Sequence, residues 1–351
     1  MKLISKIAHS TAVTLLAVGS ITSVSAATES SHVFTATTDI QTQILSIEAQ
    51  LAKGTTVNYS DSASLRAIAA AAADHPPSSC LANYTDTSLP MGKCTQGATG
   101  GSKTMVLLGD SHAWQWIGPL NSLAKARNWK FVSFAKASCP DVNAIFTLTS
   151  TQRAPSSLLN RPYVACATWR DQALAAIRAL KPYVIVMSGE YRAETMYTWP
   201  AKTPITDAAA ESAMQTTLKG YLTGAGARLV NIADTPYEGI GSLTPAECLS
   251  RNPRLTPNPN PRGVWPHDYT YCYRPYLYDN PYPAIRSALS AAATTSGVTL
   301  VDPAKWFCDT GTEGICPPIL GGVVTFTDAA HIANSYALQL APLLGAYLPA
   351  S

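Results

Sequence analysis

Five short apolar runs alternate along the chain with longer segments of helical spacing. The runs predict strands over residues 104–108, 130–134, 183–187, 228–232 and 298–301. The segments that follow them predict helices over residues 112–127, 169–180, 207–222, 283–293 and 335–348. Continuous apolar strands separated by helices are typical of a parallel sheet that is covered on both faces. With right-handed crossovers, the pattern predicts an α/β fold, a three-layer α/β/α sandwich around a five-stranded parallel sheet.

The first 26 residues have the three parts of a secretion signal. Lys2 and Lys6 supply the positive start, residues 12–21 the short apolar stretch, and Val24-Ser25-Ala26 a small-residue cleavage site. A membrane anchor is the alternative, but the apolar stretch is shorter than a bilayer requires. We therefore expect residues 1–26 to be a signal peptide that is removed, and the protein to be secreted or placed in the periplasm or another extracytoplasmic space.

Removing 26 of the 351 residues leaves 325, which is long for one domain but suits an α/β fold with insertions. We expect a leader of helices and loops over residues 27–100, a main domain over 101–351, and within it an insertion over 236–282. Loss of the two signal lysines lowers the formal charge from +3 to +1, so no nucleic acid or anionic membrane is expected as a partner. No later stretch of the sequence is long and apolar enough to be a transmembrane segment of the mature chain.

The chain has eight cysteines, all of them outside the signal segment. An even number in an exported protein favours disulfides, although eight cysteines allow about 105 pairings. Pairing between sequential neighbours predicts Cys80–Cys94, Cys139–Cys166, Cys248–Cys272 and Cys308–Cys316. A zinc site is the alternative, but the sequence has neither a C-x-x-C pair nor an H-E-x-x-H motif. We expect no metal and no cofactor.

Two short motifs supply the parts of an activated nucleophile. Gly109-Asp110-Ser111-His112-Ala113 follows the first predicted strand, and Asp328-Ala329-Ala330-His331 precedes the last predicted helix. A serine hydroxyl needs a base to accept its proton, and the base needs a carboxylate to hold its tautomer. The alternative for each motif alone is a helix cap. Their conjunction predicts Ser111 as nucleophile, His331 as base and Asp328 as the orienting carboxylate.

The chain resembles the SGNH hydrolases, and among them the extracytoplasmic SGNH domain that is often fused to membrane acyltransferase-3 proteins. The resemblance rests on four segments and spans roughly Cys80 to the C-terminus. The segments are V-L-L-G-D-S-H-A-W-Q-W at 106–116, S-C-P at 138–140, L-V-D-P at 300–303 and T-D-A-A-H at 327–331. It implies the flavodoxin-like SGNH fold for residues 101–351 and the same roles for Ser111, His331 and Asp328.

Two blocks that many SGNH enzymes carry are absent. Residues 136–139, after the second strand, lack the usual Gly, residues 188–191, after the third, do not form a G-x-N-D motif, and neither stretch offers the expected Asn. The Ser111 backbone N–H is therefore the leading candidate for the oxyanion donor, with Ser138 and Ser188 as weaker ones. His112 is expected to be structural, and Glu190 either to bind substrate or to pair with Arg192. An α/β-hydrolase is a more distant alternative, because Ala113 stands where its G-x-S-x-G motif requires glycine.

These features predict an exported serine esterase or O-acyltransferase that works through a Ser-His-Asp triad and an acyl-enzyme. The resemblance implies acetyl esters of cell-surface or extracellular glycans as the substrate class, an O-acylated carbohydrate or a small ester as the bound molecule, and a separate membrane protein as an acyl donor. The choice between hydrolysis and transfer stays open. The alternative is a catalytically weak or inactive glycan-binding module of the same fold.

Overall fold

The computed structural model describes residues 38–89, 94–139, 154–190, 226–236, 244–251, 297–311 and 314–350, with a few short stretches between them. All of these lie in the unit Phe34–Ser351. The helices are α1 (Thr38–Ala52), α2 (Ser62–Ala71), α3 (Ser111–Trp114), α4 (Ile117–Ala126), α5 (Val164–Leu180), α7 (Pro245–Arg251), α10 (Asn334–Gln339) and α11 (Ala341–Gly345), with 3-10 turns η1 (Ser78–Cys80), η2 (Ser156–Leu158) and η3 (Ala304–Trp306).

The strands fall into one large sheet and four two-stranded pairs. The large sheet holds β2 (Thr95–Gly97), β3 (Lys103–Gly109), β4 (Trp129–Ala135), β5 (Val184–Ser188), β8 (Arg228–Ile232) and β11 (Thr299–Val301). The pairs are β1 (Val57–Asn58) with β9 (Arg254–Leu255), β6 (Tyr197–Thr198) with β7 (Thr203–Pro204), β10 (Arg274–Pro275) with β12 (Ile315–Cys316), and β13 (Ile319–Leu320) with β14 (Val323–Val324).

The central sheet has the strand order β11-β8-β5-β3-β4-β2. Its first five members are parallel. Numbered along the chain and read from β4 to β11, they have the order 2-1-3-4-5 of flavodoxin-like folds. All five predicted strands are thus confirmed. The sixth, β2, pairs antiparallel with β4 inside a segment that the sequence describes as a loop. Strand β2 consists of Thr, Gln and Gly, so no apolar run marks it as a strand. Short polar strands of this kind are common at the edge of a sheet.

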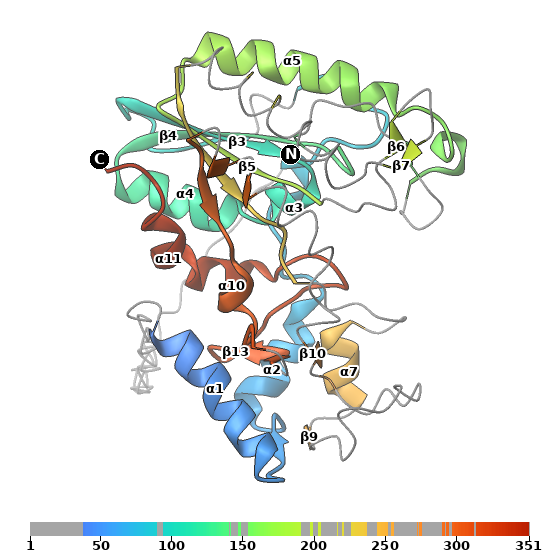
Figure 1. Cartoon of the computed structure of the whole chain (residues 1–351), viewed down its shortest axis with the longest axis vertical. Coiled ribbons are helices and arrows are strands. Elements are labelled where there is room, and N and C mark those ends of the chain that lie inside the picture. Colours follow the sequence, from blue (N-terminus) through green and yellow to red (C-terminus); the bar gives the residue numbers. More distant parts are fainter. Residues whose placement is uncertain are drawn as a thin grey trace, which may run out of the picture. The chain divides into compact units, whose positions relative to one another are not determined.

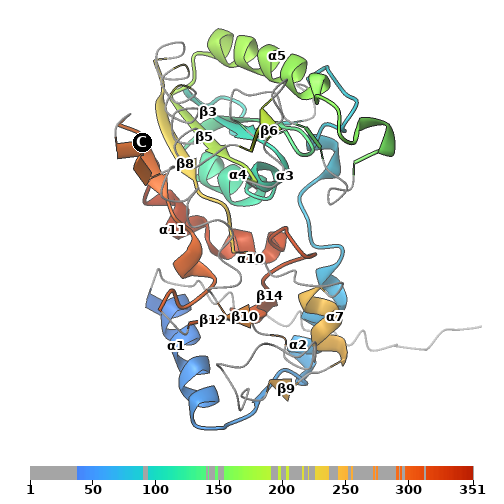
Figure 2. The same cartoon turned by 45° about the vertical axis from the view of Figure 1, so that its right-hand side comes forward.

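Each face of the sheet packs against its own helical layer (Figures 1 and 2). In β3, Val106 and Leu108 belong to the apolar cluster that includes the inward side of α5. Met105 and Leu107 belong to the cluster that includes α4, α10 and α11. All four side chains are fully buried. Because alternate side chains of a strand point to opposite faces, this accounts for an unbroken apolar run and confirms the three-layer sandwich.

Proline explains where two predicted helices divide. The segment 112–127 is two helices, α3 and α4, because Pro119 in the first turn of α4 has no N–H to continue the ladder from α3. In the same way Pro342 opens α11 and separates it from α10. Helix α5 begins at Val164, five residues before the predicted start. The predicted helices at 207–222 and 283–293 lie largely outside the described residues, and the signal segment 1–26 lies wholly outside them.

The four predicted disulfides are all present, and among the described residues no cysteine is free: Cys80–Cys94, Cys139–Cys166, Cys248–Cys272 and Cys308–Cys316. Two of them fasten long loops. Cys139–Cys166 joins the turn after β4 to α5, and Cys248–Cys272 fastens α7 within the 236–282 insertion. Within the described part of the chain, no helix is long and apolar enough to cross a membrane.

Helix α7 is specified by its own sequence. Thr244 precedes Pro245, and Glu247 follows two residues later. The Thr244 Oγ1 accepts a hydrogen bond from the Glu247 N–H at 3.2 Å, and the Glu247 carboxylate accepts one from the Thr244 N–H at 2.8 Å. This reciprocal capping box, with proline at the first helical position, fixes where the helix starts. The insertion therefore contributes a defined element, which packs against α2.

Candidate active site

The turn after β3 places Ser111 at the carboxyl end of the central sheet, at the start of α3. Gly109 makes this turn sterically feasible. Its φ is +153°, and a Cβ there would lie 1.8 Å from the backbone oxygen of Ser188 on the neighbouring strand. Asp110 then caps α3, since its Oδ1 accepts the His112 N–H at 2.8 Å. Ligands of parallel α/β sheets bind at the carboxyl ends of the strands, so Ser111 lies at the edge of the sheet where a ligand is expected to bind.

Asp328 and His331 lie together in a tight loop ahead of α10. The His331 Nδ1 is 2.8 Å from Asp328 Oδ2, and the backbone N–H groups of Ala330 and His331 both donate to Asp328 Oδ1 at 2.8 Å. The Thr327 N–H donates to the His331 carbonyl at 2.9 Å and closes the loop. With Nδ1–H donating to the carboxylate, the His331 Nε2 carries the lone pair of a base.

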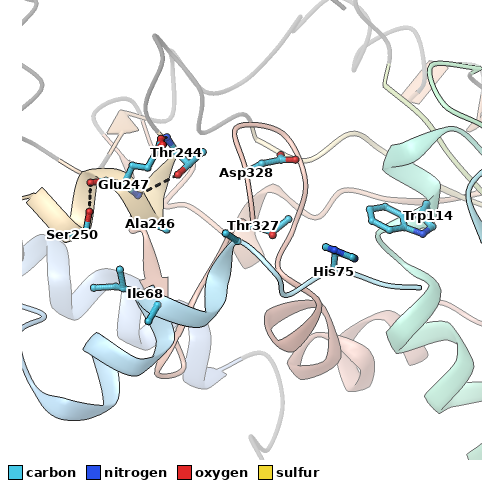
Figure 3. A pocket seen from close by; sticks show the side chains of 11 residues that line it. Ile68, His75, Trp114, Thr244, Ala246, Glu247, Ser250, Thr327 and Asp328 are labelled. Carbon is cyan, nitrogen blue, oxygen red and sulfur yellow. Dashed lines mark hydrogen bonds between the residues drawn. The ribbon is translucent and has the colours of Figure 1, made fainter. Parts of the chain in front are cut away.

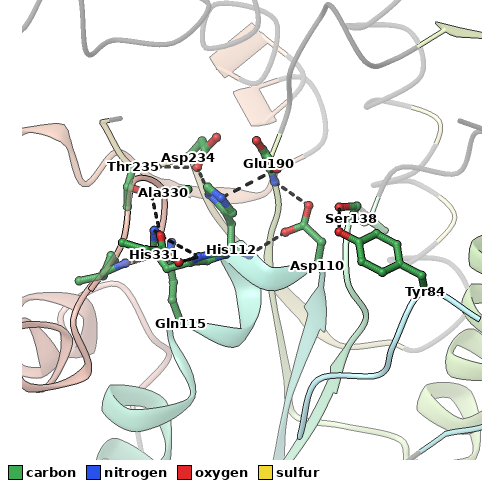
Figure 4. Close-up of polar contacts among 12 residues, drawn as sticks. Tyr84, Asp110, His112, Gln115, Ser138, Glu190, Asp234, Thr235, Ala330 and His331 are labelled. Carbon is green, nitrogen blue, oxygen red and sulfur yellow. Dashed lines mark hydrogen bonds and ion pairs between the residues drawn. The ribbon is translucent and has the colours of Figure 1, made fainter. Parts of the chain in front are cut away.

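The loop is held against α3, the helix that carries Ser111. The Ile332 N–H donates to the Gln115 Oε1 at 2.9 Å. The His331 ring lies 5.2 Å from the ring of His112 and 6.0 Å from that of Trp114, measured between centroids. The His331 Nε2 is buried and has no hydrogen-bond partner among the described residues. The two segments that carry the predicted triad, which are more than 200 residues apart in the chain, therefore contact each other through His112, Gln115, His331 and Ile332 (Figure 4).

The electrostatics of the pair suit a carboxylate that stays ionised. Burial alone would raise the pKa of Asp328, but the hydrogen bond and the charge of His331, with the two backbone N–H donors, hold it well below its usual range. Asp328 therefore remains an anion in the neutral range. An ionised carboxylate at this distance is suited to orient an imidazole and to stabilise it in its protonated form.

The two serines proposed as secondary oxyanion donors lie at the ends of the neighbouring strands. Ser138 has a left-handed backbone, with φ 48°, and its hydroxyl lies 3.3 Å from the Tyr84 hydroxyl. Ser188 is the last residue of β5 and is fully buried, and its Oγ has no hydrogen-bond partner in the described part of the chain. Neither hydroxyl is brought to the His331 loop by a hydrogen bond among the described residues.

Asp234, which follows β8, is a residue near the site that the sequence did not predict. Its Oδ1 lies 2.6 Å from the His112 Nδ1, while Glu190, after β5, donates its N–H to Asp110 Oδ2 at 2.9 Å. Burial raises the pKa of the Asp110 carboxyl to about 7, against the lowering effect of His112. The signal was available, since Asp234 follows a predicted parallel strand, and such strand ends share one edge of the sheet. Arg192, the alternative partner of Glu190, lies outside the described residues.

A cavity of about 510 Å³ opens beside the Asp328–His331 loop (Figure 3). Asp328 and Thr327 lie on one wall and Trp114 with His75 on another. The remaining wall comes from α2 and α7, with Ile68, Ala69, Ala72, Thr244, Ala246, Glu247 and Ser250. The predicted leader and the predicted insertion thus meet at a pocket next to the Asp328–His331 pair. Within the residues that the structure describes, no group of three or more His, Cys, Asp or Glu side chains is placed to hold a metal ion.

Comparison with known proteins agrees with this fold. A family profile described as "SGNH domain (fused to AT3 domains)" matches residues 79–346. The periplasmic domain of the lipopolysaccharide acetyltransferase of Salmonella ser. Paratyphi A has a similar structure. Its TM-score is 0.50 at 15% identity over 71% of this chain and 84% of that one. A second solved structure has a TM-score of 0.36 at 10% identity, over 70% and 96% of the two chains. No curated protein sequence matches the chain.

Proposed function

Because the chain belongs to the family of SGNH domains that are fused to acyltransferase-3 domains, we propose that it is an exported serine esterase or O-acyltransferase with Ser111, His331 and Asp328 as its triad. The family supports an acyl-related function. The observation that carries the proposal is the Asp328–His331 pair beside the Ser111 turn, with a buried His331 Nε2 that has no partner among the described residues. A helix cap alone would not require an imidazole whose second nitrogen is kept buried and unbonded.

In the first half of the proposed reaction, the Ser111 Oγ attacks the acyl carbonyl and its proton passes to the His331 Nε2. The tetrahedral intermediate then collapses, the ester C–O bond breaks, and the same proton passes to the leaving alkoxide. The product is an acyl-enzyme on Ser111. In the second half, His331 accepts a proton from water or from a sugar hydroxyl, whose oxygen attacks the acyl-enzyme. The bond between the acyl carbon and the Ser111 Oγ then breaks, and His331 returns the proton to the Oγ. Water gives hydrolysis, and a sugar hydroxyl gives transfer.

The oxyanion of both intermediates needs donors at the carboxyl end of β3. The Ser111 N–H is the first of α3, and the first N–H groups of a helix have no acceptor within it. It remains the leading candidate. Ser138 and Ser188 stay secondary candidates, and Ser138 would have to exchange its contact with Tyr84 for one with the substrate.

The cavity beside Asp328 supports a carbohydrate ester as the substrate. A pocket of about 510 Å³ is within the size range of small-ligand sites. The hydroxyls of Thr244 and Ser250 and the carboxylate of Glu247 offer polar contacts, while Trp114 offers an aromatic surface. Aromatic rings combined with hydrogen-bonding groups suit the mixed polar and apolar faces of a sugar ring. We propose that the glycan part of the ester lies here, with its acyl group directed at Ser111.

The site of action proposed is outside the cytoplasm, because the similar Salmonella structure is a periplasmic domain and the sequence begins with a predicted signal. The family's association with acyltransferase-3 domains supports a membrane protein as acyl donor. Such a donor would acylate Ser111, and a glycan hydroxyl would then accept the acyl group.

The first test is Ser111→Ala assayed on 4-nitrophenyl acetate. We expect hydrolysis to fall to background while the thermal melt is nearly unchanged, since only one oxygen at a half-buried position is removed. Ser122→Ala is the matched control, because Ser122 is an exposed serine on the adjacent α4, and it should keep full activity. Activity of Ser111→Ala near that of the wild type would reject the nucleophile. A wild type that binds acetylated glycans without any turnover would favour the binding-module alternative.

A further inference from the structure

A cluster of four ionisable side chains, three of them buried and Glu190 partly buried, surrounds the Ser111 turn and is not used by the proposed reaction. Asp110 and His112 flank Ser111, Glu190 follows β5, and Asp234 follows β8. Asp110 and His112 are each 1% exposed, and Asp234 is 7% exposed. Three parallel strands thus end in titratable groups at one edge of the sheet (Figure 4). Burying ionisable groups is unfavourable unless they are paired.

The pairs within this cluster tie the Ser111 turn to the ends of β5 and β8, which lie on the same side of β3. On one flank of Ser111, the Asp110 Oδ2 accepts the Glu190 N–H at 2.9 Å. On the other, the His112 Nδ1 lies 2.6 Å from Asp234 Oδ1, and the Thr235 N–H donates to that oxygen at 2.8 Å. Because the Thr235 N–H fixes the carboxylate, Asp234 fixes the ring of His112 in turn.

The ring of His112 also contacts the proposed base. Its centroid lies 5.2 Å from that of His331, with an angle of 59° between the ring planes. The charged groups around His112 are Asp234, Glu190, whose Oε2 lies 4.0 Å from the His112 Nε2, Asp110 on its own turn, and His331 on the loop before α10. Burial opposes protonation, but the three carboxylates raise the pKa of His112 to about 10. His112 is therefore an imidazolium at neutral pH.

We propose that His112, held by Asp234, is a positioning residue of this site, which fixes the Ser111 turn and places a positive charge beside the ring of His331. This rests on the proposed function, because it assumes that His331 is the base. A positive charge next to His331 opposes a second positive charge on that ring. The consequence is that the enzyme keeps an unprotonated base, and hence its activity, to lower pH than it would without His112.

The test is the pH profile of kcat/KM on 4-nitrophenyl acetate for wild type, His112→Gln, Asp234→Asn and the double variant. His112→Gln removes the positive charge and leaves the carboxylates, so the acid limb should move to higher pH by about 0.5–1 unit. At the pH optimum, kcat should fall about 10-fold for either single variant while KM changes less than twofold. The double variant should lose little more than the worse single variant, because the pair acts as one unit. Lys125→Gln, which removes a positive charge from an exposed position on α4, is the control and should leave the limb in place.

An acid limb that does not move in His112→Gln would overturn the proposal and leave a structural role only. A change confined to KM would also overturn it, since it would place His112 in substrate binding. If His112→Gln does not fold, nitrogen-15 NMR of the wild-type imidazoles decides: the His112 ring must keep both N–H protons up to about pH 8, and a neutral ring at pH 7 rejects the proposal. Activity that survives Ser111→Ala would instead reject the proposed function, so the two failures are distinguishable.

Discussion

At the residue scale, Asp328 performs two tasks with two oxygens. Its Oδ1 accepts the N–H groups of Ala330 and His331, which shapes the loop, while its Oδ2 faces the His331 Nδ1. Substitution by asparagine retains an oxygen for the first task and places an NH₂ group at the second. The loop should therefore survive the substitution, and the tautomer of His331 should not.

We predict that Asp328→Asn lowers kcat on 4-nitrophenyl acetate by about 10²–10⁴-fold with little change in KM, because the new NH₂ donates to Nδ1 and leaves the proton on Nε2. His331→Ala should lose at least as much, and the double variant little more than the worse single one. Asp171→Asn, an exposed substitution on α5, is the control. If the two fold-losses in kcat simply multiply in the double variant, or if Asp328→Asn leaves kcat unchanged, the D-x-x-H motif is only a helix cap.

The sequence could predict the members of this pair because the three-residue spacing is local. It could not predict the His112–Asp234 contact, which joins residues 122 positions apart. That contact depends on the strand order, which places β8 one strand away from β3 across β5. The expectation that His112 is structural named only packing or a hydrogen bond at the start of the helix, whereas its ring is paired with a carboxylate and lies against His331.

At the element scale, the predictions that succeeded concern elements whose own residues carry a clear sequence pattern. The five apolar strands were predictable because a strand buried on both faces is apolar throughout. Strand β2 was not, because its backbone pairing with β4 leaves no pattern in three residues that are polar or glycine. The divisions of α3 from α4 and of α10 from α11 follow from Pro119 and Pro342, which helical periodicity alone does not register. The capping box of α7 is a sequence signal for a helix start, but it lies within a long irregular insertion for which no helix was predicted.

The Cys248–Cys272 bridge should matter for binding, because Cys248 lies on α7 and residues of α7 line the cavity. We predict that the double substitution Cys248→Ser and Cys272→Ser raises KM for glucose pentaacetate several-fold while kcat on 4-nitrophenyl acetate changes less than twofold. Loss of a bridge that closes a loop of this length should also lower stability by about 3 kcal/mol.

The control for this variant is Cys308→Ser with Cys316→Ser, a bridge whose cysteines do not line the cavity. It should lower the melting temperature without raising KM for glucose pentaacetate. An unchanged KM in the Cys248 and Cys272 variant, measured below its melting temperature, would show that α7 does not contact the substrate.

At the scale of the whole molecule, the N-terminal segment that the sequence describes as a leader packs into the core of the SGNH fold. Ile40, Ile44, Ile47 and Leu51 of α1 are buried within the same apolar cluster as one face of the central sheet. The Glu48 carboxylate accepts the Ile315 N–H at 3.0 Å. Asp74 accepts the Ser335 N–H at the start of α10, and Thr327 donates its hydroxyl to the Ala71 carbonyl at 2.6 Å. The segment therefore supports the loop that carries Asp328 and His331.

We predict that Ile44→Ala destabilises the protein by about 2–5 kcal/mol, because it removes a fully buried side chain from α1. The neighbouring Leu45→Ala should have an effect within about 0.5 kcal/mol, since the Leu45 side chain is 47% exposed. Urea unfolding of both variants measures the difference. Equal and small effects would mean that α1 is not part of the cooperative fold.

The central claim is that Ser111 is a nucleophile activated by His331, and covalent labelling tests it most directly. The protein is treated with a fluorophosphonate, digested with trypsin and analysed by mass spectrometry. Cleavage after Lys103 and Lys125 places Ser111 in the peptide 104–125, which also contains the exposed Ser122 as an internal control. We predict a single adduct on Ser111, absent in Ser111→Ala and formed much more slowly in His331→Ala. No adduct, an adduct on Ser122, or undiminished labelling of Ser111→Ala would contradict the account.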